Sequence, residues 1–133
     1  MDKVLIDTSV WVEFFRGHEP CREVVRELID SESVCCTGLI LAELMQGAKT
    51  EKELAVLNDF PQTFPFLPDR VELWIKAGQL AFTLRRQGTT VGLGDCFIAV
   101  SAAEAGASIA TLDTHFSLLR NNIAIELLSF PSP

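Results

Sequence analysis

The feature that most constrains the fold lies near the start of the chain, where a short apolar run ends in a carboxylate. The run Val4-Leu5-Ile6 leads directly into Asp7. An amphipathic pattern follows at once, and its apolar face consists of Val10, Trp11, Phe14 and Phe15. This order predicts a strand over residues 3–7 and a helix over residues 8–16. Because open α/β sheets bind ligands at the carboxyl ends of their strands, we expect Asp7 at such an edge.

The rest of the chain continues this alternation of strand and helix patterns. Further strands are predicted over residues 34–37, 107–111 and 123–128. Helices are predicted over residues 19–30, 38–47, 50–60, 69–87, 95–105 and 115–120, while prolines keep residues 64–68 extended. Alternation of this kind favours a parallel sheet with helices on both faces. We predict an α/β fold in which the 133 residues form one domain, 1–133.

The charge balance excludes one class of nucleic-acid binder. The formal net charge is −7, so the chain lacks the general basic surface that coats nucleic acid. A phosphate can still bind to an acidic pocket that is loaded with divalent metal. The composition therefore leaves a nucleic-acid substrate open, provided that a cation mediates the contact.

The cysteines and the apolar segments indicate a cytoplasmic protein. The four cysteines form no C-x-x-C pair, and the chain has only two histidines. This argues against a zinc site. No segment reaches the ~20 uninterrupted apolar residues that a membrane span needs. Asp7 and Glu13 interrupt any signal-like region at the start of the chain. We expect reduced thiols and no membrane partner.

Four acidic residues are placed where they can meet at one edge of the predicted sheet. Asp7 and Asp113 each follow a strand, and Glu43 lies in the helix after the second strand. Asp95 opens a later helix, so the glycine-rich loop 89–94 has to return it to that edge. Since carboxyl ends of parallel strands share an edge, we expect the acids to converge.

Each acid also has a structural interpretation. Asp7 and Asp95 could cap the helices that they precede, and Asp113 could serve a turn. Glu43 fits neither role, because it is expected among buried apolar neighbours, where an acid needs a partner. Converging carboxylates repel one another unless a cation is present, and oxygen ligands favour Mg²⁺ or Mn²⁺.

Four motifs, in a fixed order, carry a resemblance to a known family. They are Leu5-Ile6-Asp7-Thr8-Ser9-Val10-Trp11, Leu41-Ala42-Glu43-Leu44, Gly94-Asp95-Cys96-Phe97-Ile98-Ala99 and Ala110-Thr111-Leu112-Asp113-Thr114-His115-Phe116. In these motifs and their spacing the chain resembles the PIN domains, and within them the VapC-like ribonuclease toxins of bacterial toxin–antitoxin pairs. The resemblance implies a three-layer α/β/α fold with a central, mostly parallel sheet of about five strands.

The resemblance also implies roles for particular residues. It makes four acids catalytic and gives them two supporting hydroxyls: Asp7, Glu43, Asp95 and Asp113, with Ser9 and Thr111. Asp7, Asp95 and Asp113 would hold Mg²⁺, or alternatively Mn²⁺. Glu43 would orient the attacking water or complete the site through an outer contact.

The implied function is Mg²⁺-dependent hydrolysis of RNA phosphodiester bonds by a toxin. A VapB-like antitoxin would be its protein partner, and the resemblance also implies a homodimer. Two alternatives are a non-catalytic PIN-like scaffold that binds protein or RNA, and an RNA-processing nuclease that is not a toxin. A phosphatase or phosphotransfer receiver is disfavoured, because Ser9 stands where a dehalogenase-like phosphatase has its second aspartate and no lysine follows Lys76.

Substrate contacts are less well defined by the sequence. Arg16, Arg85, Arg86 and Lys49 follow or end helices and could contact RNA phosphates. They could equally be solvated residues that offset helix dipoles. For the aromatic residues of the first helix, core packing is favoured over a groove for the antitoxin.

Overall fold

A short parallel sheet stands at the centre of the molecule. In the computed structural model, which describes residues 2–130, the sheet order is β2-β1-β3. Its strands are β1 (Val4–Ile6), β2 (Val34–Cys35) and β3 (Ser108–Ala110). Both pairings are parallel, and Ile6 lies opposite Ala110 at the carboxyl end. Every residue of β1 is buried, as is usual for a central strand covered on both faces.

The sheet has fewer regular strands than predicted. Among the described residues there are three strands rather than about five. Two further extended segments join through single parallel bridges, Cys36 with Phe66 and Ile109 with Leu127. Proline cannot donate to a ladder, so Pro65 and Pro68 restrict the first segment to this bridge. The predicted strand over residues 123–128 is likewise reduced to the bridge at Leu127.

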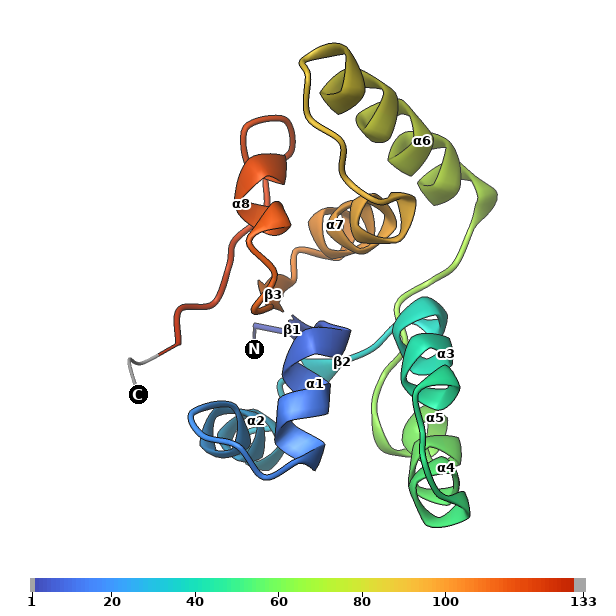
Figure 1. Cartoon of the computed structure of the whole chain (residues 1–133), viewed down its shortest axis with the longest axis vertical. Helices are drawn as coiled ribbons and strands as arrows, with labels where there is room; N and C mark the ends of the chain where they lie inside the picture. Colours follow the sequence, from blue (N-terminus) through green and yellow to red (C-terminus); the bar gives the residue numbers. More distant parts are fainter. Residues whose placement is uncertain (1, 131–133) are drawn as a thin grey trace.

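Helices cover both faces of the sheet and extend beyond its β2 edge. Figure 1 shows α1 and α2 on one side, α7 and α8 on the other, and α6 outside α7. The three-layer α/β/α architecture is therefore confirmed, and the helix predicted over residues 50–60 is divided into α4 and α5. The helices are α1 (Thr8–Phe15), α2 (Cys21–Asp30), α3 (Gly38–Gln46), α4 (Glu51–Asn58), α5 (Phe60–Thr63), α6 (Val71–Arg86), α7 (Leu93–Ala105) and α8 (His115–Leu119). Within residues 2–130, none of these helices combines the length and apolar character that crossing a membrane requires.

Helix α7 is the most deeply buried helix and fixes the distance between the sheet and α6. All its residues from Cys96 to Ala102 are buried, and their mostly small side chains allow close packing. On its outer side Trp74 of α6 stacks on Phe97, with ring centroids 3.8 Å apart. The helix ends at Gly106, whose φ of 66° lies in the left-handed region that glycine favours. The predicted stop at Gly106 is confirmed, and it turns the chain back into β3.

The aromatic residues of α1 divide between the core and the surface. Trp11 is 1% exposed and contacts Phe60 and Phe64, with ring centroids 5.0 and 5.7 Å away. Phe14 is half-buried against it. Phe15, however, is 45% exposed, so the expectation that it is core is wrong for this residue. Its position one residue beyond Phe14 turns the ring out of the core.

Candidate metal and active site

Asp7 lies at the carboxyl end of β1 and is fixed by two hydroxyl groups. Its backbone N–H donates to the Ala110 carbonyl at 2.9 Å, which extends the β1–β3 pairing by one residue. The side chain is 6% exposed, and its Oδ2 accepts from Ser9 Oγ and Thr111 Oγ1, both at 2.9 Å. Its Oδ1 accepts no hydrogen bond from any residue between 2 and 130. One oxygen is therefore held while the other is free to bind a ligand.

The same two hydroxyls position the loop that follows β3. Ser9 Oγ accepts from the backbone N–H of Leu112 at 3.0 Å. Thr111 Oγ1 accepts from the backbone N–H of Asp113, also at 3.0 Å. Ser9 and Thr111 thus connect Asp7 to the segment that carries Asp113, which is a structural reason for hydroxyl side chains at both positions.

Asp113 forms a close cluster with Asp95 and His115. One ligand atom from each residue can be chosen so that all three atoms lie within 4.8 Å of one another. Asp113 Oδ1 accepts from the His115 backbone N–H at 2.9 Å and lies 3.2 Å from His115 Nδ1. Asp95 stands in the first turn of α7, and a Cβ added to Gly94 would lie 3.5 Å from the Leu39 side chain. The start of α7 therefore packs directly against α3.

The other three predicted acids all act electrostatically on Asp95. Burial, and after it the nearby charges of Asp113, Asp7 and Glu43, raise the pKa of this carboxyl to about 6, while His115 opposes them. Negative charges that disfavour the ionisation of a carboxyl lie near it. A divalent cation would relieve the repulsion, and the donor set of carboxylate oxygens fits such an ion.

Glu43 joins the site from α3, but it is exposed rather than buried. The expectation of a buried acid is therefore wrong. The buried residues of α3 are Ile40 and Leu44, and Glu43 lies on the flank of the helix that faces α1. There its Oε1 accepts from Thr8 Oγ1 at 2.9 Å.

The structure also decides between the alternatives for the other acids. Asp7 occupies the N-cap position of α1 without a side-chain cap hydrogen bond. Asp95 lies inside α7, whose N-cap is Gly92. Capping therefore explains neither residue. Asp113 does serve a turn, because it accepts from His115, and this role leaves it inside the acidic cluster.

Two residues of the site were not identified from the sequence. The sequence argument counts His115 only among possible zinc ligands, although its position two residues after Asp113 places it in the same turn. Thr8 was assigned only to the first helix, although its hydroxyl holds Glu43. In each case the signal was proximity in sequence to a predicted acid.

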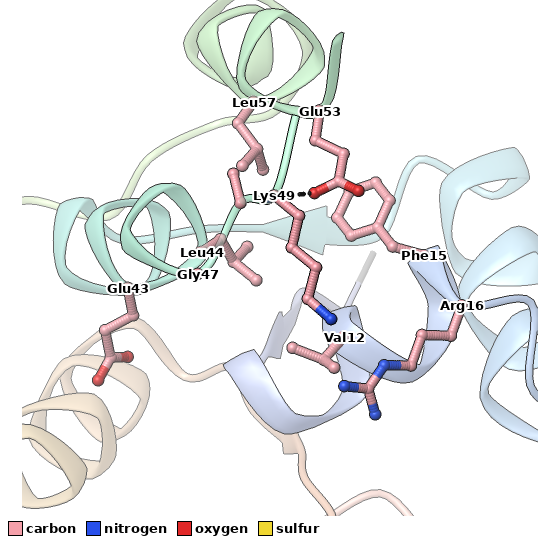
Figure 2. A pocket seen from close by; sticks show the side chains of 10 residues that line it. Val12, Phe15, Arg16, Glu43, Leu44, Gly47, Lys49, Glu53 and Leu57 are labelled. Atoms are coloured by element: carbon pink, nitrogen blue, oxygen red, sulfur yellow. Dashed lines mark hydrogen bonds between the residues drawn. The ribbon is translucent and has the colours of Figure 1, made fainter. Parts of the chain in front are cut away.

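The basic candidates fall into two groups. Arg16 lines a cavity of about 250 Å³ between α1, α3 and α4, together with Glu43 and Lys49 (Figure 2). Arg85 and Arg86 end α6, where the Arg86 guanidinium lies 5.8 Å from the Phe82 ring. Arg16 and Lys49 share this cavity with Glu43, one of the four acids.

Comparison with known proteins gives a consistent result. The family model of the PIN domain matches residues 4–122. Ribonuclease VapC11 of Mycobacterium tuberculosis (strain H37Rv) is 32% identical over 133 residues, covering 96% of this chain and 98% of the relative. The tRNA(fMet)-specific endonuclease VapC of Salmonella typhimurium is 31% identical over 117 residues, covering 84% and 86%. The crystal structure of DNA-bound VapBC from Salmonella typhimurium contains a similar chain, with a TM-score of 0.74, 28% identity and coverage of 96% and 98%.

Proposed function

Because the chain belongs to the PIN domain family and, within it, to the VapC-like proteins, we propose that it is a metal-dependent endoribonuclease. It acts as the toxin of a toxin–antitoxin pair and hydrolyses phosphodiester bonds of RNA in the cytoplasm. A VapB-like antitoxin is its protein partner. The observation that carries the proposal is the convergence of Asp7, Glu43 and Asp113 on Asp95, which gives the site the charge that a divalent cation requires.

The similar proteins support both the chemistry and the partner. One is named a ribonuclease and another an endonuclease specific for tRNA(fMet). The similar solved chain comes from a VapBC assembly bound to DNA. Coverage of at least 84% of each chain makes transfer of the activity to this chain reasonable.

In this proposal Asp7, Asp95 and Asp113 hold the metal, which is Mg²⁺ or Mn²⁺. Hard oxygen donors favour these ions over softer transition metals. When bound, the ion supplies Lewis-acid activation of the scissile phosphate and neutralises the negative charge that develops on it. Ser9 and Thr111 keep the Asp7 carboxylate oriented toward the ion, as outer partners of metal ligands do.

Glu43 has a different role, because it stands apart from the cluster of Asp95, Asp113 and His115. Its Oε1 is held by Thr8, while Oε2 accepts no hydrogen bond from the described residues. That free oxygen can accept a proton from the water that attacks the phosphate. Thr8 keeps the carboxylate aimed at the same edge of the sheet, so the water is oriented before the reaction.

The test is cleavage of a mixed pool of structured RNAs by purified, antitoxin-free protein, with Mg²⁺ and with EDTA. Wild-type protein is expected to cut only with Mg²⁺, and Asp95→Asn, prepared identically to exclude a contaminating nuclease, is expected not to cut. Antitoxin binding by Asp95→Asn should be retained. Cutting that persists in EDTA, or folded wild-type protein that cuts no RNA in the pool, would favour the scaffold alternative.

A further inference from the structure

The cavity between α1, α3 and α4 lies beside the acidic site. Its walls are partly apolar, and its rim carries charges of both signs. Figure 2 shows Glu43 at one side and the Lys49 and Arg16 side chains extending toward Val12 on the other. Because Glu43 lines the cavity and also belongs to the acidic site, a chain that enters the site can continue into this cavity.

The two cations of the cavity are available to a ligand. The Lys49 ammonium makes no ion pair within residues 2–130, and the Lys49 contact with Glu53 is made by the backbone N–H. Arg16 has one long contact with Glu13, at 3.5 Å, and its side chain is 56% exposed. Arg16 and Lys49 line the cavity together with the carboxylates of Glu43 and Glu53, so a phosphate that enters it can contact both cations.

An aromatic ring is exposed next to these cations. Phe15 lines the cavity and stacks on Trp11 on one side, with ring centroids 5.8 Å apart and an angle of 23° between the planes. The Phe15 ring also lies near Phe14 and Phe60, with centroids 5.5 and 6.4 Å away, and 45% of the residue remains exposed. Cations that contact phosphates beside an aromatic ring that stacks a base are the usual elements of single-stranded nucleic-acid sites.

We propose that this cavity binds the nucleotide next to the scissile phosphate of a single-stranded RNA segment. Arg16 and Lys49 contact its phosphate, and Phe15 stacks on its base. The inference rests on the proposed ribonuclease function and names its substrate subsite. Local cations matter here because a protein with a net charge of −7 otherwise repels RNA.

The test measures binding of a short single-stranded RNA to catalytically inactive Asp95→Asn protein at several salt concentrations. Removing either cation by Arg16→Ala or Lys49→Ala should weaken binding about tenfold at low salt and reduce the slope of log K against log salt by about 0.7 per cation. Lys52→Ala is the matched control, because Lys52 is an exposed lysine of α4 outside the cavity. It should bind RNA like the parent protein.

The outcomes separate this proposal from the ribonuclease function itself. If Lys49→Ala and Lys52→Ala bind RNA equally, the subsite is wrong while the nuclease assignment stands. If the two cavity variants bind RNA normally but lose antitoxin affinity, the cavity is a protein-docking surface instead. Failure of any RNA to bind the parent protein would count against the nuclease assignment.

Discussion

The two sides of the acidic site are built differently. On one side Asp7 is 6% exposed and accepts from both Ser9 and Thr111. On the other side Glu43 is exposed and accepts from Thr8 alone. A buried carboxylate with two donors keeps its orientation when a cation binds, whereas an exposed carboxylate with one donor can follow a moving water. The difference supports a ligand role for Asp7 and a proton-accepting role for Glu43.

The largest effect is expected for Asp7→Asn, which removes the charge of the buried carboxylate that Ser9 and Thr111 hold. Cleavage should fall by more than about 100-fold, beyond the loss that is typical for an outer partner of a metal ligand. Metal affinity, measured by calorimetry, should fall as well. Asp30→Asn, at an exposed acid that ends α2, removes the same charge far from the cluster and should change neither quantity. Unchanged metal affinity in Asp7→Asn would contradict the ligand role.

Glu43→Gln tests the role of the exposed carboxylate. The kcat should fall about 100-fold because the proton acceptor is lost, while metal affinity and KM stay near their wild-type values. Single-turnover cleavage together with calorimetry separates the two quantities. If metal affinity falls as far as in Asp7→Asn, Glu43 is a metal ligand like Asp7, and the assignment of different roles to the two acids is wrong.

The hydroxyls of Thr111 and Thr8, which donate to Asp7 and Glu43, should affect different quantities in the same way as these acids, but with smaller effects. Thr111→Val keeps the shape of the side chain but removes a donor to Asp7, so metal affinity should fall about tenfold. Thr8→Val removes the donor to Glu43 and should leave metal affinity unchanged while lowering kcat. Equal effects of both substitutions on metal binding would argue against separate roles.

The smallest effect concerns stability and pH in the metal-free protein. The pKa of Asp95 is raised to about 6 from 3.8, so the folded state binds this proton more tightly than the unfolded state does. Its stabilising contribution is complete below pH 3.8 and is lost as the pH rises through about 6. After allowance for solvent screening of this half-buried carboxyl, the loss is about 1 kcal/mol.

Denaturant unfolding between pH 4 and pH 8 measures this contribution. Asp95→Asn should be more stable than wild type at pH 8 and lose the part of the pH dependence that belongs to this group. Divalent metal should reverse the destabilisation in wild type alone. An identical pH profile for both proteins would show that the acids do not repel one another at this position.

The layers of the fold and the convergence of the acids could be predicted from local patterns. Asp7 follows an apolar run, and Gly106 stands where a helix has to end, so each position follows from neighbouring residues alone. Parallel strands then bring their carboxyl ends to one edge, whatever the lengths of the connections.

What could not be predicted depends on packing between distant segments. The exposure of Glu43 is set by where α1 lies relative to α3, which helical periodicity does not reveal. Phe15 belongs to the same apolar face as Trp11, and only the positions of Phe60 and Phe64 decide which ring is covered. His115 enters the cluster through a turn hydrogen bond whose geometry no residue pattern specifies.

The hydrogen bond from Thr111 to Asp7 joins residues that are 104 positions apart. During synthesis the first acid therefore precedes its supporting hydroxyl by about 5 to 20 seconds, at rates of about 5–20 residues per second. For that interval a nascent chain carries Asp7 without the loop that completes the site, so it cannot cut RNA near the ribosome that makes it. An antitoxin translated in the same period would meet a chain that is still harmless.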